Sequence, residues 1–210
     1  MTTPQEIALM KSIRDKFHVE IQQVAAGSSV PAEFLAALVA GESGGRPDAK
    51  RFERGVLASL WEVLQGRAAN FGSIGRSDLL TYILPIADPR TPLSQQLTTA
   101  MQRLDSLATS WGLTQIMGYE AIPFGVDAGT FTPPLSSLHY TCRMLADFAA
   151  HKGLDLTKDF SELLDCWNTG RPHAPTADPA YIPNGLARMA IYRDLGPLLP
   201  ADPARQGQSA

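Results

Sequence analysis

The sequence predicts a mainly helical globular protein, and three observations lead to this class. Apolar residues recur at the spacing of a helix in several segments, and capping or stop residues stand at the ends of those segments. Few runs alternate between apolar and polar residues, and no unit repeats at a fixed period. The 210 residues are 44% hydrophobic and 19% charged, which is near the usual balance and suits one domain with additions.

The first two predicted helices lie at the N-terminus. Thr3-Pro4-Gln5-Glu6 resembles a capping box with proline at the first helical position, and Gly27 closes the helix. The apolar positions of this helix are Ile7, Met10, Ile13, Phe17, Ile21 and Val24. The second helix follows Val30 and Pro31 and ends at Gly44 and Gly45. Its apolar stripe consists of Phe34, Leu35, Leu38 and Val39.

Further helices are predicted along the chain. A third spans about residues 55–65, and Thr91-Pro92 begins another. We expect the latter to face the core with Leu93, Leu97, Met101, Leu104 and Ala108. Shorter periodic segments predict helices starting near Ser136 and spanning about residues 161–168 and 184–195.

The expected domain organisation follows from these segments. Residues 1–29 would form an N-terminal helix packed on a main domain of residues 30–199. Residues 67–90 have a mixed composition with several glycines and prolines, so we expect an insertion or irregular arm there. Residues 200–210 should form a flexible tail.

Charge and cysteine content exclude several classes of function. Eighteen basic and 21 acidic residues give a net charge of −3, which disfavours a general nucleic-acid binder. Cys142 and Cys166 are too few for a disulfide framework, and neither they nor the four histidines show the spacing of metal ligands. We therefore expect no metal and no organic cofactor.

The N-terminus lacks the pattern of a signal peptide, and no apolar run approaches 18 residues. We expect a soluble protein made in the cytoplasm without membrane insertion. If its target lies outside the cell membrane, it must be released by other means or leave by non-classical secretion.

Glu42 is the first candidate for catalysis. It follows Leu35, Leu38 and Val39 at offsets of 7, 4 and 3, so helical geometry aligns its carboxyl group with the apolar stripe. Partial burial disfavours a charged carboxylate and raises its pKa, as a general acid near neutral pH requires. Alternatively, Glu42 is a helix-end residue that hydrogen-bonds locally or points into solvent.

The same segment also fits a different reaction. Residues 41–45 read Gly-Glu-Ser-Gly-Gly, which matches the G-x-S-x-G elbow of serine hydrolases, with His139, His151 and His173 downstream as candidate bases. An elbow requires a buried strand before the serine. The segment before Ser43 is rich in alanine and leucine and has helical periodicity, which disfavours this alternative.

Four short motifs occur in a fixed order along the chain. They are Glu42-Ser43, the segment Gly-Leu-Thr-Gln-Ile-Met at 112–117, Trp167-Asn168-Thr169-Gly170 and Tyr181-Ile182. In this order they resemble lytic transglycosylases of the goose-lysozyme-like superfamily. Lys50-Arg51-Phe52-Glu53 and the Ser-Trp-Gly of residues 110–112 are similar to phage-type N-acetylmuramidases. The resemblance covers about residues 30–195.

The resemblance implies a lysozyme-like fold, in which a helical lobe and a smaller lobe flank a groove for glycan strands of peptidoglycan. It implies that Glu42 protonates the glycosidic oxygen and that the Tyr181 hydroxyl hydrogen-bonds Glu42. The sequence departs from the family pattern at Thr114, where a methionine is usual, and at Cys166-Trp167. These departures leave the substrate preference open.

Further site residues are expected on chemical grounds. Gln115 could recognise N-acetyl and hydroxyl groups of amino sugars, although an interior glutamine could instead satisfy nearby backbone groups. Trp167 and Trp111 offer flat faces to sugar rings, yet large aromatic residues are common in cores. Asn168 shares a helix face with Leu164 and would be costly if buried without a partner. Ser43 would support Glu42 or cap the helix end.

Glu53 is the candidate second carboxylate. Its alternative role is a favourable interaction with the N-terminal dipole of the helix that follows it. A catalytic Glu53 would favour hydrolysis by a pair of carboxylates. If Glu53 is idle, the resemblance implies that the N-acetyl group of the substrate assists cleavage and that a 1,6-anhydro sugar forms.

We therefore expect an enzyme that cleaves the β-1,4 bond between N-acetylmuramic acid and N-acetylglucosamine, with lysozyme-type hydrolysis slightly favoured over transglycosylation. Its partner would be peptidoglycan, its state a monomer, and its biological setting that of a phage lysin or a virion component. The alternative from another class is a glycan-binding or phage structural protein without turnover.

Overall fold

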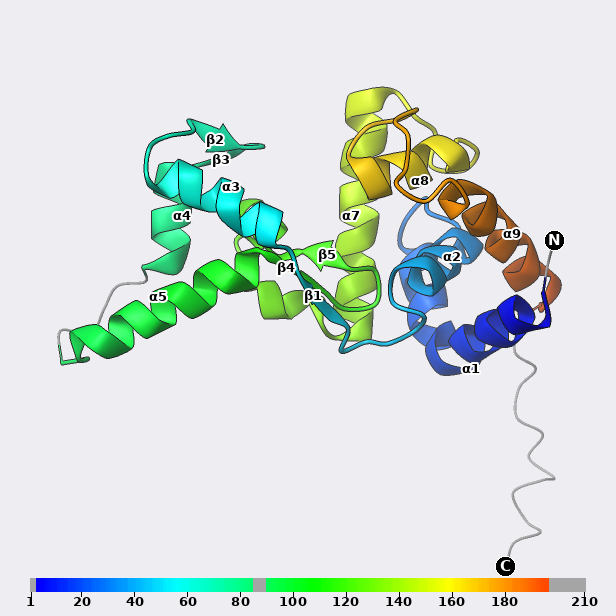
Figure 1. The fold of residues 1–210 in the computed structure, drawn as a ribbon. Coiled ribbons are helices and arrows are strands. Elements are labelled where there is room, and N and C mark those ends of the chain that lie inside the picture. Colours follow the sequence, from blue (N-terminus) through cyan, green and yellow to red (C-terminus); the bar gives the residue numbers. More distant parts are fainter. Residues whose placement is uncertain (1–2, 85–89, 197–210) are drawn as a thin grey trace, which may run out of the picture. The chain divides into compact units, whose positions relative to one another are not determined.

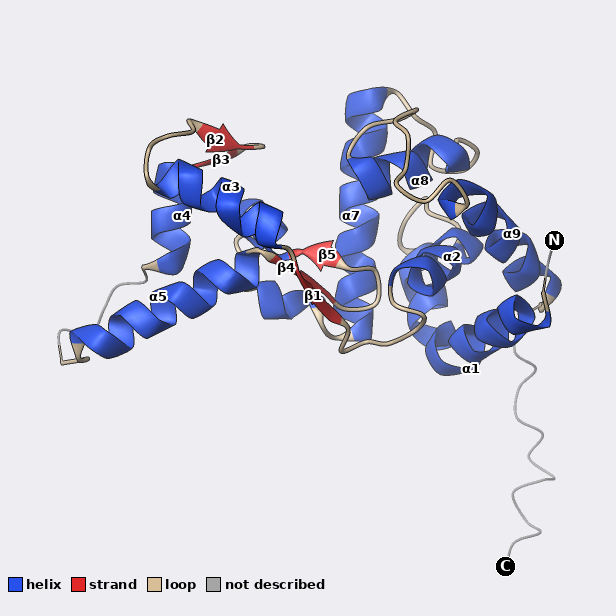
Figure 2. Cartoon of the chain, viewed as in Figure 1, coloured by secondary structure: helices blue, strands red, loops and turns tan. Residues whose placement is uncertain are grey.

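The computed structural model describes residues 3–84 and 90–196. Helices account for most of these residues, and the strands are short (Figure 2). This confirms the predicted mainly α class. The chain divides into two compact units, of which the first contains residues 1–45 and 141–210 and the second residues 46–140. Residue 29, where we expected a boundary, lies inside the first unit, and the expected tail of residues 200–210 lies outside the described residues.

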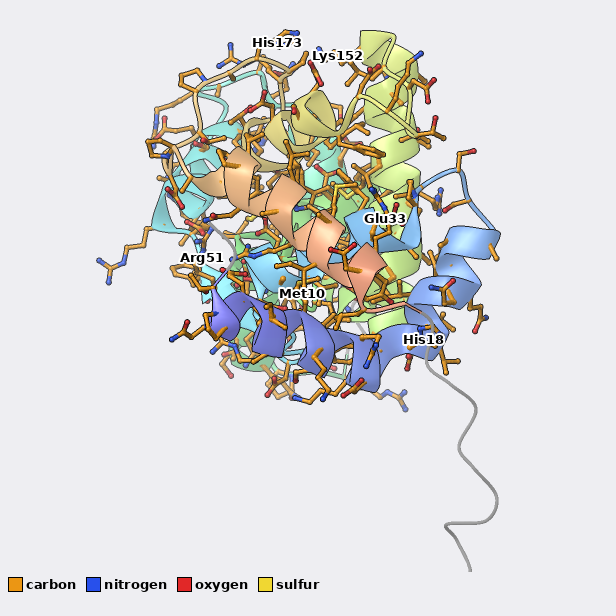
Figure 3. All side chains as sticks on the ribbon, turned by 90° about the vertical axis from the view of Figure 1, so that its right-hand side faces the viewer. Met10, His18, Glu33, Arg51, Lys152 and His173 are labelled. Atoms are coloured by element: carbon orange, nitrogen blue, oxygen red, sulfur yellow. The ribbon has the colours of Figure 1, made fainter. Side chains whose placement is uncertain are left out.

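The first unit consists of helices. They are α1 (Pro4–Ala26), α2 (Ala32–Glu42), α8 (Phe160–Thr169) and α9 (Tyr181–Asp194), and α7 (Pro134–Lys152) ends in this unit. Five of the six apolar residues predicted for α1 are buried, including Met10, which Figure 3 labels; Ile7 is exposed. Every residue of α2 from Phe34 to Ala40 is buried, because α1 and α9 both pack against α2 (Figure 1). An apolar surface all round a helix is typical of such a central position.

The close packing of α9 on α8 depends on a glycine. A Cβ atom at Gly185 would lie 2.6 Å from Cδ1 of Leu164 on α8, which is closer than carbon atoms can approach. The missing side chain therefore allows the two helices to approach each other. This contact fixes the first turns of α9, where Tyr181 lies.

The described part of the second unit combines helices with small antiparallel sheets. The helices are α3 (Arg54–Leu64), α4 (Arg76–Ile83) and α5 (Leu93–Leu107). Strands β1 (Lys50–Phe52), β4 (Thr109–Trp111) and β5 (Ile116–Met117) form an antiparallel sheet in the order β1-β4-β5. Strands β2 (Asn70–Phe71) and β3 (Ile74–Gly75) form a hairpin, and the short helices η1 (Gly118–Glu120), α6 (Ala121–Phe124) and η2 (Ala128–Phe131) precede α7.

The segment of residues 67–90 is more regular than its composition suggested. Its described part forms β2, β3 and α4. Leu79 and Ile83 of α4 are buried in the core of this unit with Leu60, Val63 and Leu104 from α3 and α5. Residues 85–89 of the expected arm lie outside the described residues.

The predicted inward stripe of α5 is wrong for its first half. Leu93, Leu97 and Met101 are 69%, 57% and 49% exposed, whereas Leu104 and Ala108 are buried. The periodicity is that of a helix along the whole segment, but core residues pack only against its second half. Helical spacing shows which residues share a face, and it does not show how far the core extends along that face.

Candidate functional site

Glu42 is the last residue of α2 and is half-buried. The chain then turns through Gly44 and Gly45, whose φ angles of 62° and 76° lie in the left-handed region. A Cβ atom at Gly45 would lie 3.1 Å from Ile13 of α1, so this turn lies close against the first helix. The sequence prediction that α2 ends at the two glycines is confirmed, and the turn leaves Glu42 at the C-terminal end of the helix.

Tyr181 is the first residue of α9, three positions earlier than the helix start expected from the sequence. The turn before it is organised by Asp178, whose side chain accepts a hydrogen bond from the Ala180 N–H at 2.9 Å. The Tyr181 N–H donates to the Asp178 carbonyl oxygen at 3.0 Å. Pro183 is tolerated in the first turn because no intrahelical acceptor is available for an N–H there.

The Tyr181 hydroxyl donates a hydrogen bond of 2.6 Å to Oε1 of Glu42. This length is typical of a hydroxyl bound to a carboxylate. Burial raises the pKa of Tyr181 far above its usual value of about 10, and the charge of Glu42 and this hydrogen bond act in the same direction. The hydroxyl therefore keeps its proton and acts as the donor. The predicted hydrogen bond between Tyr181 and Glu42 is confirmed.

Two residues that the sequence did not single out for the site lie beside this pair. Arg188, one of the residues of α9, donates from Nε and Nη2 to both carboxylate oxygens of Glu6 at 2.9 and 3.1 Å. A Cβ atom at Gly41 would lie 3.4 Å from Nη1 of Arg188 and 4.0 Å from the Tyr181 ring. Glu6, which the sequence suggested as part of a capping box, thus binds Arg188; the other half of the box, from the Glu6 N–H to Thr3, is present.

Ser43 is buried, and its hydroxyl donates to the Val39 carbonyl oxygen at 3.2 Å. This contact agrees with the expectation that Ser43 supports the end of the helix. A helix, α2, precedes Ser43 in place of the buried strand that a nucleophile elbow requires. The structural context of a serine hydrolase is therefore missing at this position.

Trp167 and Asn168 lie in the last turn of α8, which ends at the left-handed Gly170. Trp167 is half-buried, and Asn168 is exposed although Leu164 on the same face is buried. The condition under which its amide would need a protein partner, burial, is therefore not met, because water can satisfy it. Its expected role in substrate binding stays a prediction.

Gln115 belongs to the second unit, and its side chain bonds to groups of that unit. The amide nitrogen donates to the carbonyl oxygens of Ala49 and Gly112 at 3.1 and 3.0 Å, and Oε1 accepts from Ser110 at 2.8 Å. Its φ angle of 54° is unusual for a residue with a side chain. This geometry corresponds to the structural alternative for Gln115, in which the amide satisfies nearby backbone groups.

Glu53 and Trp111, also in the second unit, have partners there. Oε1 of Glu53 lies 2.5 Å from Nε of Arg51, and the Glu53 side chain makes no capping hydrogen bond to α3. Trp111 donates from Nε1 to the Ser106 carbonyl oxygen at 3.0 Å, and Nζ of Lys50 lies 4.3 Å from the centre of the ring. One face of the Trp111 ring therefore carries a cation.

Within residues 3–84 and 90–196, no group of three or more histidine, cysteine or acidic side chains could hold a metal ion. In the same part of the chain, no helix is long and apolar enough to cross a membrane. Comparisons with protein-family models, with curated proteins and with solved structures found no match.

Arg188 is a site residue that sequence reasoning missed. It lies outside the four motifs, and an arginine within a helix is usually a surface residue. Glu6 could be singled out because it stands three residues after Thr3, but this spacing points equally to a role in helix capping.

Proposed function

We propose that this protein is a peptidoglycan-cleaving glycosidase with a lysozyme-like fold, which acts on the β-1,4 bond between N-acetylmuramic acid and N-acetylglucosamine. Glu42 is its general acid. The observation that carries the proposal is the 2.6 Å hydrogen bond from Tyr181 to Glu42, which joins two residues 139 positions apart. Both belong to the motifs in which the sequence resembles lytic transglycosylases.

The hydrogen bond suits a general acid because it fixes the carboxyl group. Tyr181 binds Oε1 and so holds the carboxyl group that would transfer the proton. As the C1–O bond breaks, this proton moves to the glycosidic oxygen, which leaves as a hydroxyl group. In hydrolysis, water then adds to C1, and a carboxylate group accepts the proton that the water releases. The half-buried position of Glu42 limits competition from water for its carboxyl group.

Glu42→Gln tests this proposal, because an amide of nearly the same shape cannot donate the proton. Glu33→Gln is the matched control: Glu33 lies on the same helix, in its first turn, and pairs with Arg193. The assay measures new reducing ends and 1,6-anhydro ends in purified peptidoglycan, and circular dichroism shows that both variants are folded. We expect a loss of about 10²–10⁴-fold for Glu42→Gln and activity within a factor of two for the control. Absence of cleavage by the native protein, or full activity of Glu42→Gln, would overturn the proposal.

Lytic transglycosylation is the second candidate, and the ion pair between Glu53 and Arg51 favours it. The guanidinium group of Arg51 lies against Oε1 of Glu53 and competes with water or a sugar for that oxygen. Without a second carboxylate, the C6 hydroxyl of the muramic acid residue would attack C1 and close the 1,6-anhydro ring. Mass spectrometry of the products distinguishes the reactions, since hydrolysis adds the mass of one water and transglycosylation adds none.

A further inference from the structure

The ion pair between Arg188 and Glu6 connects α9 to the first turn of α1. The arginine side chain is 16% exposed and the glutamate side chain 30% exposed. Both carboxylate oxygens accept hydrogen bonds, from Nε and Nη2 of the guanidinium group. Paired contacts of this kind fix the plane of the guanidinium group, which a single contact does not.

The third nitrogen of Arg188 lies against Gly41, the residue before the candidate acid. Nη1 is 3.4 Å from the position that a Cβ atom of Gly41 would occupy, and Gly41 directly precedes Glu42. The Tyr181 ring lies 4.0 Å from the same position. Arg188 and Tyr181 therefore both lie within van der Waals distance of this position in the last turn of α2.

Charged groups of three helices surround the Tyr181 hydroxyl or its neighbour. Glu42 on α2 accepts the hydrogen bond of the hydroxyl, Arg188 on α9 acts on it electrostatically, and Glu6 on α1 pairs with Arg188. The positive charge of Arg188 acts against the rise in the pKa of Tyr181, although burial and Glu42 have the larger effects. Glu6 in turn balances that positive charge, and Arg188 keeps the pKa of Glu6 below its usual value.

We infer that Arg188, oriented by Glu6, is a positioning residue that holds the Tyr181–Glu42 pair in place and sets the balance between the charged and neutral forms of Glu42. The inference rests on the proposed function. It gives α1, which lies outside the region of resemblance, a role in the site. A purely structural ion pair would tie α1 to α9 without affecting the protonation of Glu42.

The two partners predict shifts of opposite sign. Arg188→Met removes the cation and leaves Glu6 nearby, so the charged form of Glu42 becomes less favourable and its titration midpoint should rise. Glu6→Gln leaves the cation unbalanced, so the midpoint should fall. We expect shifts of at least about 0.5 pH unit each, since a charge within a few ångströms changes the pKa of a carboxyl group by about one unit or more before screening. Loss of packing would move both variants in the same direction.

The test uses carboxyl-labelled full-length protein and follows the Glu42 resonance by NMR during a pH titration. Arg193→Met is the matched control, because Arg193 is also on α9 and pairs with a glutamate, Glu33, on another helix. This control should leave the Glu42 midpoint unchanged. Arg188→Lys keeps the charge without the paired contacts, and its midpoint should lie between those of the native protein and Arg188→Met. The result also stands if Arg188→Met fails to fold, because Glu6→Gln and Arg188→Lys still give signed shifts.

The second readout is cleavage of peptidoglycan as a function of pH. Arg188→Met should lower kcat at least tenfold with KM within a factor of two, and should move the alkaline limb of the profile to higher pH. Equal Glu42 midpoints in the native protein, Glu6→Gln and Arg188→Lys would overturn the inference. If the native protein cleaves nothing, the proposed function fails, and the NMR titration still decides whether Arg188 controls Glu42.

Discussion

The hydrogen bond between Tyr181 and Glu42 makes a prediction about stability that does not depend on activity. Tyr181→Phe deletes only the hydroxyl, and Glu42→Ala removes the acceptor. The bond is 2.6 Å long and its acceptor is a carboxylate. Hydrogen bonds to charged groups contribute about 1.5–3 kcal/mol, compared with about 0.5–1.5 kcal/mol between neutral groups. Both side chains are half-buried, so water replaces the lost partner only in part.

The assay is a double-mutant cycle at pH 7, in which urea unfolding of the native protein, both single variants and the double variant is followed by circular dichroism. We expect a coupling energy of about 1.5–3 kcal/mol between the two substitutions. The cycle cancels effects that each substitution has alone, such as removal of a negative charge from the C-terminal end of α2.

The matched control is the pair Arg193→Met and Tyr181→Phe. These residues are twelve positions apart on α9, and Arg193 contacts Glu33. Their effects should add to within about 0.5 kcal/mol. A Tyr181–Glu42 coupling energy no larger than that of the control would refute the reasoning, because the hydrogen bond would then contribute nothing to the folded state.

Three further predictions concern the scaffold. Burial, with a smaller contribution from Glu120, raises the pKa of Tyr119 to about 12. The unfolded chain therefore loses this proton at a lower pH, about 10, and the native protein should become less stable by about 2–3 kcal/mol between pH 10 and 12. In urea unfolding, Tyr119→Phe should lack this part of the decrease in stability. Gly112→Ala should cost about 2–5 kcal/mol, because its Cβ would lie 2.1 Å from the Phe131 carbonyl oxygen at a φ of 74°; Gly129→Ala, with open space around it, should change stability by less than about 1 kcal/mol. Arg188 lowers the pKa of Glu6, so the stability that Glu6→Gln removes should be present above about pH 4.5 and should shrink as the pH falls below that value, as measured by chemical unfolding at stepwise lower pH.

The sequence predicted the seven longer helices because their signals are local. Apolar spacing, the Thr3 cap and the glycines after α2 all act within a few residues. The strands were not predicted because each has only two or three residues, which is too short to show alternation. Helix α4 was missed because glycines and prolines surround its eight residues and its two buried side chains contact residues far along the chain.

Some residues of the candidate site could likewise be predicted from local patterns, and others could not. Glu42 could be found from its alignment with the apolar stripe of α2, and Tyr181 only through the resemblance. The sequence could not distinguish a glutamine that binds sugars from one that joins neighbouring segments of its own unit, as Gln115 does here, because both roles need the same amide.

The sequence by itself determined where the main helices form and which carboxyl group lies at the end of a buried one. The tertiary structure decided what that carboxyl group contacts. Tyr181 is 139 positions from Glu42, and Arg188 is 182 positions from Glu6. Side chains so far apart in the chain meet only when α1, α2 and α9 pack together, and the packing depends on details such as the missing side chain of Gly185. Local sequence patterns do not predict these contacts, because they show which residues share a face of one helix and not which residues of different helices meet.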